Sequence, residues 1–397
     1  MKWPLVKISD FCQTGSGGTP SREVSEYYQG DIPWIKSGDL RENIVTSATE
    51  FISNEAIQKS SAKIVPRGAI LVAMYGATVG RMALLGIDAA TNQAVCYVVP
   101  NPSKADTKYV YYALLSKVPD FLRSAIGGAQ PNISQGLIRS TEIPLPPLSE
   151  QKRIAAILDK ADAIRRKRQQ AIQLADDLLR AVFLDMFGDP VTNPKEWPVK
   201  TLGAITKDWR GGASITPDDF TDSGFPVLHK GAIQKQGKIV VDGSKKTFVS
   251  SDFSYRKKSS LIKNNCIAIT LRDLVPSGPS IGLMADLSDY DADIYLLSQG
   301  AYGFAVEPEI AHAAYLVALS NHDGFRQVFR KISVGSTQIH IRSSDVKSLS
   351  LPVPPVKLQS EFGNLRSAVM GYQKKAASVG EGDLLLSLAQ KAFSGQM

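Results

Sequence analysis

Hydrophobic and polar positions follow the same order in the two halves of this chain. Apolar runs rich in β-branched residues predict buried strands at 69–74, 94–99, 266–271 and 302–306. A helical pattern follows each pair of strands, at 107–125 and at 309–331. Each half therefore predicts a mixed α/β unit, and we interpret the chain as two such units in tandem.

Short motifs recur at nearly constant spacing and support this interpretation. Trp3-Pro4 and Gly17-Gly18 recur 194 residues later as Trp197-Pro198 and Gly211-Gly212. Other residues recur 208 positions later; they are Gly127, Gln130, Ile133, Pro144, Pro146, Pro147 and Gln151, matched by Gly335, Gln338, Ile341, Pro352, Pro354, Pro355 and Gln359. Chance would not preserve this order, so we predict one scaffold, duplicated, whose two copies differ between the anchors.

A proline-rich phrase precedes a long helical pattern in each half. Pro146 and Pro147 disfavour a helix before them and let one begin at about Ser149, which suits a helix start. The pattern continues to Phe187, where Gly188 favours termination. A helix of this length would extend roughly 58 Å at 1.5 Å per residue.

Apolar residues in this helix follow a heptad, and so do the equivalent positions near the C-terminus. The predicted helix-pairing residues are Ile154, Ile157, Ile164, Leu178, Phe362, Leu365, Val369 and Tyr372. Matching seams predict that the two helices pack on each other. Gly380 and Gly382 predict a weak point in the second helix. The alternative is two amphipathic helices that each lie on their own domain.

These patterns divide the chain into four segments. The first recognition domain is predicted at 1–145, the central helix at 146–190, the second domain at 191–351 and the C-terminal helix at 352–397. A length of 397 residues, with 43% hydrophobic and 21% charged residues, is typical of a globular protein with two or three domains.

Charge and chain termini narrow the possible partners. A formal net charge of +8 is compatible with a polyanionic partner such as nucleic acid, or with a solvated basic surface. No apolar run is long enough to predict a membrane span. The N-terminal stretch MKWPLVKISDFCQ lacks an apolar signal core, so we expect a cytoplasmic protein with no membrane partner.

Signatures of catalysis are absent from the sequence. It contains no GxxxxGK[ST] phosphate loop, no HExxH and no GxSxG elbow. The four histidines and three cysteines show no metal-ligand spacing. We therefore expect a binding protein with no catalytic residues, no metal site and no cofactor of its own.

Basic and amide side chains cluster around the repeated motifs and are the candidate DNA contacts. They are Lys36, Arg41, Lys63, Arg67, Arg81, Asn92, Gln93, Gln130, Asn132, His229, Lys230, Lys245, Lys246, Arg256, Lys257, Arg272, Gln299, Gln338 and His340. Lys and Arg neutralise phosphates, and Arg, Asn and Gln make two-point contacts to guanine or adenine edges. For each one, a solvated loop residue is the alternative. The basic run 165–168 on the central helix could meet DNA phosphates, and the alternatives are a solvated helix surface or a salt-bridged contact with another subunit.

The chain resembles the specificity (S) subunit of type I restriction-modification systems over both halves. The resemblance is carried by the proline phrase 144–154 (PLPPLSEQKRI), the helix end 184–190 (LDMFGDP), Trp197-Pro198, Leu202-Gly203 and the loop 127–133 (GGAQPNI). The segments between these motifs carry little family signature.

This resemblance implies two α/β (α+β) target recognition domains in tandem, joined by two long antiparallel helices that form a coiled-coil spacer. Each domain would read one half of a split site in double-stranded DNA, and the helices would set the distance between the halves. The subunit would have no catalysis of its own. It would work with two modification (M) subunits, which use S-adenosylmethionine to methylate adenine. Restriction (R) subunits would use ATP and Mg to translocate and cut DNA.

Two other hypotheses stay open at this point. The chain could be an autonomous nuclease or DNA methyltransferase with an unrecognised site, or a structural adaptor whose halves bind proteins. Salt-dependent binding of a split DNA site would favour the DNA-reading subunit over both of these hypotheses. Activity of the purified chain with only metal or S-adenosylmethionine favours an enzyme.

Overall fold

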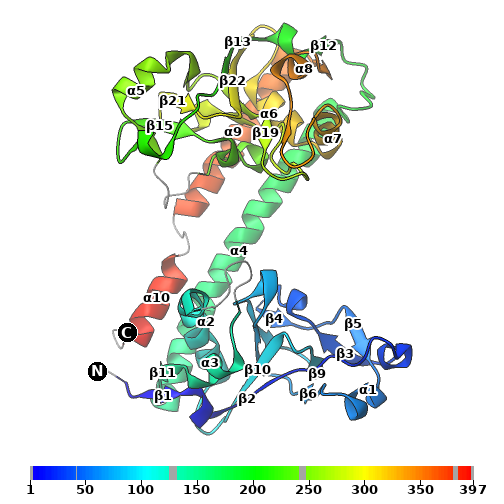
Figure 1. Cartoon of the computed structure of the whole chain (residues 1–397), viewed down its shortest axis with the longest axis vertical. Helices are drawn as coiled ribbons and strands as arrows, with labels where there is room; N and C mark the ends of the chain where they lie inside the picture. The colour runs from blue at the N-terminus through cyan, green and yellow to red at the C-terminus, as the bar shows by residue number, and fades with distance from the viewer. Residues whose placement is uncertain (1–2, 42, 125–131, 241–246, 379–382, 395–397) are drawn as a thin grey trace. The chain divides into compact units, whose positions relative to one another are not determined.

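The fold of this protein was examined in a computed structural model that describes residues 3–41, 43–124, 132–240, 247–378 and 383–394 (Figure 1). Contacts divide the chain into two compact units. Unit 1 consists of residues 1–168 and 379–397, and unit 2 consists of residues 169–378. The four-segment division of the sequence analysis stays a prediction.

Unit 1 is built on two sheets, with strand orders β2-β10-β7-β8-β4 and β5-β3-β9-β6, and a short pair β1-β11. The strands are β1 Leu5–Lys7, β2 Cys12–Ser16, β3 Ile32–Ile35, β4 Ile44–Val45, β5 Glu50–Ile52, β6 Ile64–Val65, β7 Ile70–Ala73, β8 Met82–Leu85, β9 Ala89–Thr91, β10 Val95–Pro100 and β11 Glu142–Pro144. Its helices include α1 Asn54–Lys59, α2 Thr107–Ser124 and α3 Gln135–Ser140.

Unit 2 repeats this plan, with strand orders β13-β22-β18-β20 and β14-β16-β15-β21-β17 and the short pairs β12-β24 and β19-β23. The strands are β12 Val199–Thr201, β13 Thr206–Gly211, β14 Phe220–Thr221, β15 Phe225–Leu228, β16 Phe248–Val249, β17 Leu261–Lys263, β18 Ile267–Thr270, β19 Arg272–Asp273, β20 Met284–Asp286, β21 Ile294–Leu297, β22 Ala301–Val306, β23 Ile339–His340 and β24 Ser350–Pro352. Its helices include α5 Ser251–Arg256, α6 Ala313–Asn321, α7 Asp323–Lys331 and α8 Ser343–Lys347.

Equivalent backbone hydrogen bonds confirm the internal repeat. In unit 1 the Ile133 amide donates to the Met74 carbonyl at 2.9 Å, and in unit 2 the Ile341 amide donates to the Leu271 carbonyl at 2.9 Å. Ile133 and Ile341 are a pair that the sequence motifs matched, and Met74 and Leu271 are the last residues of the predicted strands 69–74 and 266–271. The two units therefore share a topology in addition to a set of motifs.

One motif match is wrong by a single residue. In unit 1, Ser16 of β2 pairs with Cys96 of β10, and in unit 2, Gly211 of β13 pairs with Tyr302 of β22. Because these strands occupy equivalent places, Ser16 corresponds to Gly211. Gly17 therefore corresponds to Gly212, which lies 195 positions later. The cause is a register shift in β13 between Lys207 and Arg210, which inserts one residue into the strand. Asp208, inside this bulge, has a positive φ of 54°.

The proline phrase recurs because it closes each unit with the same buried clamp. Gln151 Nε2 donates to the carbonyls of Pro146 (2.8 Å) and Lys104 (3.1 Å), and Oε1 accepts from the Asp106 amide (2.9 Å). Gln359 makes the matching bonds in unit 2, to Pro354 (2.6 Å) and Ile310 (3.2 Å) and from His312 (2.9 Å). Both glutamines are 0% exposed. All their polar atoms are satisfied, as burial requires.

The long helix is present as α4, Leu148–Phe187, a single element of 40 residues. Gly188 ends it with a positive φ of 77°, and the Trp197 indole donates to the terminal Phe187 carbonyl at 2.9 Å. The C-terminal pattern forms two helices, α9 Val356–Ser378 and α10 Asp383–Phe393. Gly380 and Gly382, the predicted weak point, lie outside the described residues. The predicted helix 309–331 is also divided, at His322, whose backbone is extended (φ −67°, ψ 128°).

Within unit 2 the last part of α4 and α9 pack antiparallel. The ring of Phe362 lies 5.7 Å from that of Phe183, and Gln373 Nε2 donates to Asp176 Oδ1 at 2.8 Å. Within unit 1, α10 joins the core that contains Ile154 of α4. α4 therefore contributes to the hydrophobic core of each unit, and α9 and α10 each contribute to the core of one unit.

The predicted seam is displaced from the buried positions. Ile154 and Phe362 are buried, and Ile157 and Val369 are partly buried. Ile164, Leu178, Leu365 and Tyr372 are 45%, 51%, 37% and 56% exposed. In unit 2 the polar side chains of Asp176 and Gln373 occupy the buried interface instead, and an apolar periodicity does not register polar residues.

Candidate nucleic-acid interface

The strongest cluster of predicted contacts lies at the ends of two parallel strand pairs, one in each unit. In unit 1, β3 pairs with β9, and in unit 2, β15 pairs with β21. Lys36 follows β3, and Asn92 and Gln93 follow β9; His229 and Lys230 follow β15, and Gln299 lies just beyond β21. Because the carboxyl ends of parallel strands share one edge of a sheet, residues distant in sequence come together there.

In unit 2 this edge forms a cavity of about 570 Å³. Four of the predicted DNA contacts line it: His229, Lys230, Arg272 and Gln299. Apolar side chains complete the wall, among them Ile215, Pro217, Phe220, Val227 and Leu274. The volume falls within the range of about 300–1,000 Å³ typical of ligand pockets.

Lys230 and Arg272 converge in this cavity. A Cβ added at Gly300 would lie 2.9 Å from Cβ of Arg272 and 2.9 Å from Cδ of Lys230, so both stems pack against this glycine. Burial, and next the charge of Arg272, lower the pKa of the Lys230 ammonium below its ordinary value. The two cations therefore repel each other, an arrangement that an electron-rich ligand would relieve.

The carboxylate in the cavity is already engaged. Asp273 is 7% exposed, and its Oδ2 accepts from the Ser280 amide (2.9 Å) and hydroxyl (2.6 Å). Its Oδ1 accepts from the Val275 amide at 3.2 Å. Although burial acts to raise the pKa of Asp273, the hydrogen bonds from Ser280 hold it below its ordinary value. Asp273 therefore holds the following loop in place.

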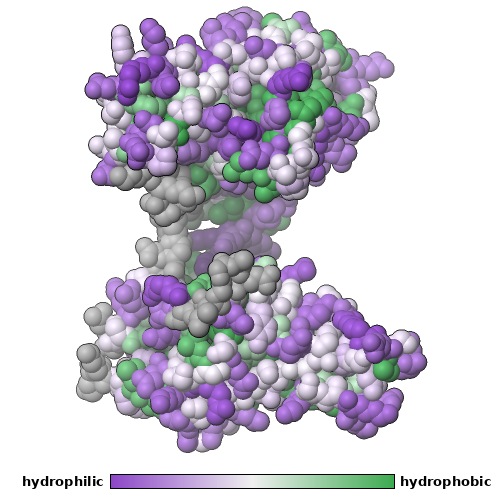
Figure 2. Space-filling view, viewed as in Figure 1, coloured by the Kyte–Doolittle hydropathy of each residue, from purple (hydrophilic) through white to green (hydrophobic). Residues whose placement is uncertain are grey.

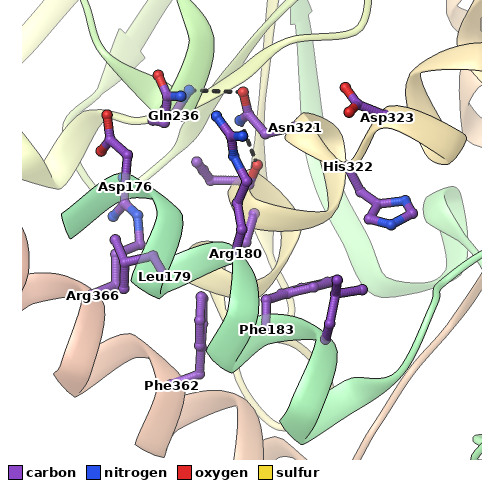
Figure 3. A pocket seen from close by; sticks show the side chains of 13 residues that line it. Asp176, Leu179, Arg180, Phe183, Gln236, Asn321, His322, Asp323, Phe362 and Arg366 are labelled. Atoms are coloured by element: carbon purple, nitrogen blue, oxygen red, sulfur yellow. Dashed lines mark hydrogen bonds between the residues drawn. The ribbon is translucent and has the colours of Figure 1, made fainter. Parts of the chain in front are cut away.

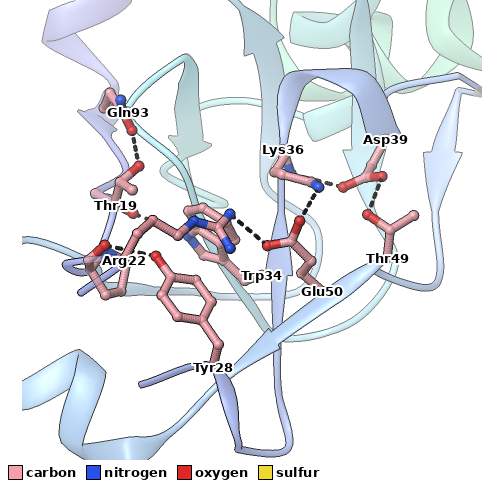
Figure 4. Close-up of polar contacts among 11 residues, drawn as sticks. Thr19, Arg22, Tyr28, Trp34, Lys36, Asp39, Thr49, Glu50 and Gln93 are labelled. Atoms are coloured by element: carbon pink, nitrogen blue, oxygen red, sulfur yellow. Dashed lines mark hydrogen bonds and ion pairs between the residues drawn. The ribbon is translucent and has the colours of Figure 1, made fainter. Parts of the chain in front are cut away.

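At the equivalent edge of unit 1, the cations are paired (Figure 4). The Glu50 carboxylate forms one ion pair with Lys36 and a second one, at 2.7 Å, with Arg22. The hydrogen bond from Lys36, followed by that from Arg22, lowers the pKa of Glu50. Lys36 keeps 32% of its side chain exposed, so the predicted contact sits in a charged network at the surface.

The sequence analysis missed the members of this network other than Lys36 and Gln93. Arg22 lies over the Tyr28 ring at 4.1 Å and over the Trp34 ring at 5.3 Å. The Trp34 indole donates to the Gly18 carbonyl at 3.1 Å, and the Thr19 hydroxyl donates to Gln93 Oε1. Only the register between β3 and β5, which opposes Trp34 to Glu50, brings these residues together. No short-range pattern in the sequence carries that register.

The remaining candidates of unit 1 are spread over its surface. Arg41, Lys63, Arg67 and Arg81 are exposed, Asn92 is partly buried, and Asn132 is exposed and bridges to Tyr75. Asn92 Oδ1 is buried with no hydrogen-bond partner among the described residues. Gln130, together with Lys245 and Lys246 of unit 2, lies outside the described residues.

The remaining described candidates of unit 2 lie at the end of α5, in β23 and in the loop before β23. Arg256 and Lys257 stand over the Phe253 ring at 5.6 and 6.0 Å, at the end of α5. His340 pairs with Arg272 across β23 and β19. Gln338 is exposed, and its carbonyl would lie 2.1 Å from a Cβ at Gly335, whose φ is 110°. This close approach explains why the loop carries a glycine.

The basic run on α4 forms salt bridges within unit 1. Arg165 and Arg166 donate to Asp162 at 2.8 and 3.0 Å. The Asp162 side chain is 4% exposed, and Asn43 also donates to it at 3.3 Å. A buried carboxylate requires compensating partners, so these two arginines stabilise Asp162 from within the chain, a role that none of the sequence alternatives named.

A second cavity, of about 180 Å³, lies in unit 2 beside α4, α6 and α9 (Figure 3). Its wall includes Phe183, Val317 and Phe362, and Asp176 and Arg366 lie at its edge. Arg366 forms a buried ion pair with Asp289 at 2.8 Å. The cavity adjoins the helix pairing and contains none of the predicted DNA contacts.

Two further properties bear on function. In the described part of the chain, no group of three or more His, Cys, Asp or Glu side chains is placed to hold a metal ion. Over the same residues, the helices are too short or too polar to cross a bilayer. Figure 2 shows hydrophilic side chains over much of the visible face of each unit, interrupted by smaller hydrophobic patches.

Curated relatives are specificity subunits of type I restriction enzymes. The MjaVIII specificity subunit of Methanocaldococcus jannaschii is 24% identical over 370 residues, covering 90% of this chain and 83% of the relative. The MjaIX subunit of the same organism is 32% identical over 225 residues. That alignment covers 52% of this chain and spans 52% of the relative. The EcoR124I/EcoR124II subunit of Escherichia coli is 34% identical over 154 residues, covering 37% of this chain and 38% of the relative.

Solved structures share the fold. The S subunit of a type I restriction-modification system from M. genitalium matches with a TM-score of 0.57 and 17% identity. The match covers 99% of this chain and 96% of that one. A chain from a study of complex assembly and conformational transition of the type I R-M system matches with a TM-score of 0.51 and 16% identity, covering 100% and 98%.

The family described as type I restriction modification DNA specificity domain matches twice, at residues 1–174 and 194–364. The two matches correspond to the two halves of the internal repeat. Together with the shared clamp and the shared strand pairings, they leave one family for the whole chain. The protein belongs to the type I restriction-modification DNA specificity family.

Proposed function

We propose that this chain is the DNA-reading subunit of a type I restriction-modification complex, in which each unit reads one half of a split site. The observation that carries the proposal is the duplicated scaffold with different chemistry at matching positions. Lys36, ion-paired in unit 1, corresponds to His229, and Tyr75 corresponds to Arg272. A scaffold that keeps its framework while changing its surface suits two different target sequences.

In this proposal the chain performs no catalysis. Modification subunits, two of them, bind S-adenosylmethionine and methylate adenine, and restriction subunits use ATP and Mg to cut DNA. Relatives named as specificity subunits of restriction enzymes support this division of labour. The complex acts in the cytoplasm, where DNA is accessible. The α4 helix and the C-terminal helices set the number of unread base pairs between the halves.

Sequencing of methylated adenines tests the proposal. A host that carries the partner genes is compared with and without this gene. The expected result is a split motif that is methylated only when the gene is present. Methylation of the same motif without this gene would contradict the proposal.

Binding measurements separate the proposal from the two other hypotheses. With modification subunits, affinity for the split site should fall steeply as salt concentration rises, because phosphate contacts release counterions. Turnover by the purified chain with only metal or S-adenosylmethionine would instead indicate an autonomous enzyme. No DNA binding under any condition would indicate a protein adaptor.

A further inference from the structure

The cavity of about 570 Å³ in unit 2 has an unusual balance of hydrogen-bonding groups. Lys230 offers three N–H donors and Arg272 offers five, and neither side chain can accept. The side chains of Lys230 and Arg272 form no hydrogen bond or ion pair with another described residue. The carboxylate of Asp273 is occupied by Ser280 and Val275. The cavity therefore presents the donors of Lys230 and Arg272 beside His229 and Gln299, whose side chains can both donate and accept.

Base edges in the major groove differ in what they accept. Guanine presents two acceptors, O6 and N7, whereas adenine presents one acceptor and one donor. Cytosine presents a donor, and thymine presents one acceptor beside a methyl group. A donor-rich pocket therefore selects guanine, because any other edge leaves a donor unpaired or meets it with another donor.

The wall of the cavity favours a base over a phosphate. Ile215, Pro217, Phe220 and Val227 supply apolar surface around the two cations. The edge of a stacked base carries C–H groups and lies beside the edges of its neighbours, so apolar surface can pack around its O6 and N7, whereas a phosphate exposes charged oxygens. Leu274 at the rim is 58% exposed, so the cavity is open to solvent.

The backbone holds the two donors in place. The Lys230 carbonyl accepts from the Thr270 hydroxyl at 2.9 Å, which ties the residue to the end of β18. Arg272 lies in β19 and pairs with His340 of β23. Gly300, with a φ of 95°, leaves room for both stems. Lys230 lies in the short turn after β15 and Arg272 lies in β19, so the backbone fixes the positions from which both side chains extend.

Unit 1 lacks this arrangement at the corresponding positions. Tyr75 stands where unit 2 has Arg272, since it bridges to Asn132 as Arg272 pairs with His340. Ser37 stands where unit 2 has Lys230, and the neighbouring Lys36 is neutralised by Glu50 on the strand beside β3. At these described positions the pair of cationic donors therefore occurs in unit 2 and is replaced in unit 1, as expected for two units that read different sequences.

We propose that this cavity reads a guanine in the half-site recognised by unit 2, with Arg272 and Lys230 donating to O6 and N7. The inference rests on the proposed function, because it requires that the chain read DNA. It goes beyond that function by assigning one base and two specificity-determining residues.

The test uses the full-length chain bound to its modification subunits and a library of random duplexes. The wild-type complex should select a guanine at one position that Arg272→Ala no longer selects. At that position, discrimination against other bases should fall about tenfold to a hundredfold, the loss of one two-point contact. Arg330→Ala, which removes an exposed arginine on α7 outside the cavity, should leave selection unchanged.

A base analogue makes the test specific to the acceptor. In 7-deazaguanine a carbon replaces N7, so it should weaken binding of the wild-type complex but have little further effect on Arg272→Ala. Arg272→Lys, which keeps the charge without the planar fork, should lose discrimination while retaining the salt dependence.

Three outcomes would overturn the inference. Arg272→Ala could weaken binding equally on all duplexes and reduce the salt slope by about one, which would assign Arg272 to a phosphate. The position affected could select a base other than guanine, or no position could be affected. A wild-type complex that shows no sequence preference in either half-site would overturn the proposed function itself. If only the guanine assignment is wrong, the wild-type complex still selects sequence in both half-sites.

Discussion

Gln373 of α9 donates a hydrogen bond from Nε2 to Oδ1 of Asp176 in α4 at 2.8 Å, and both side chains are buried in unit 2. Gln373 also donates to the Ile172 carbonyl at 3.2 Å, and Lys238 pairs with Asp176 at 3.1 Å. A carboxylate thus joins two helices and a neighbouring loop. Removing it would leave buried donors unpaired.

We therefore predict that Asp176→Ala destabilises the pairing of α4 and α9 by about 1–3 kcal/mol. The matched control is Asp177→Ala, because Asp177 is 51% exposed and its contacts with Gln173 (3.1 Å) and Arg180 (3.6 Å) lie on the exposed surface of α4. The control should change stability by less than about 0.5 kcal/mol. Hydrogen exchange of the α9 amides measures the difference. Equal exchange in both variants would contradict the role given to Asp176.

Gln359, the buried glutamine that follows the proline phrase in unit 2, should contribute more to the free energy of unfolding than its size suggests. Gln359→Leu leaves the His312 amide and the carbonyls of Pro354 and Ile310 without partners. Each unsatisfied buried group costs about 1–3 kcal/mol, so we expect a loss of at least about 2 kcal/mol. Gln327→Leu, on the exposed face of α7, is the control. Chemical denaturation of both variants checks the prediction, which fails if the two midpoints coincide.

Glu50 in unit 1 predicts a specific dependence on pH. Its pKa is lowered in the folded state, first by Lys36 and then by Arg22. Stability from this carboxylate is therefore present above its ordinary pKa and is lost as the pH falls through the lowered value. Because Glu50 is 31% exposed, we expect the contribution to stay below about 1 kcal/mol.

The measurement is thermal unfolding of the wild type and of Glu50→Gln between pH 7 and pH 2. The two melting temperatures should differ at neutral pH and converge as Glu50 becomes protonated. Glu23→Gln, which replaces an exposed glutamate that forms no ion pair with another described residue, should show no such convergence. A gap for Glu50→Gln that persists at pH 2 would exclude the ion pairs as its cause.

The proposed ruler predicts a change of spacing when α4 is lengthened. Inserting one helical turn between Arg168 and Gln169 adds about 5.4 Å. At about 3.4 Å per base pair this equals one to two pairs. Methylation-site sequencing should show an altered spacer with both half-site sequences unchanged. Gln169→Ala with Gln170→Ala, which keeps the length, should keep the spacer, and an unchanged spacer after the insertion would refute the ruler.

The repeat and the long helix were predictable because their signals are local. Prolines limit the backbone before α4, and Gly188 takes a positive φ at its end. The recurring Gln151 and Gln359 sit five residues after a proline whose carbonyl each one binds. Such short-range constraints depend on residue identity and spacing, so they remain legible without the structure.

The register and the contents of the site were not predictable in this way. The bulge at Asp208 moved the glycine match by one residue, and Glu50 met Lys36 only because β3 pairs with β5. Asp176, a polar residue, is buried between α4 and α9, whereas the apolar pattern predicted nearby positions such as Leu178 to lie there.

The sequence alone thus determined that one α/β scaffold occurs twice, where its longest helix begins and ends and which motifs close each unit. The tertiary structure decided which cations are paired, as Lys36 is, and which converge in a cavity, as Lys230 and Arg272 do. The physical reason is that backbone preferences act over a few residues, whereas charge pairing and burial depend on strands that meet from distant parts of the chain.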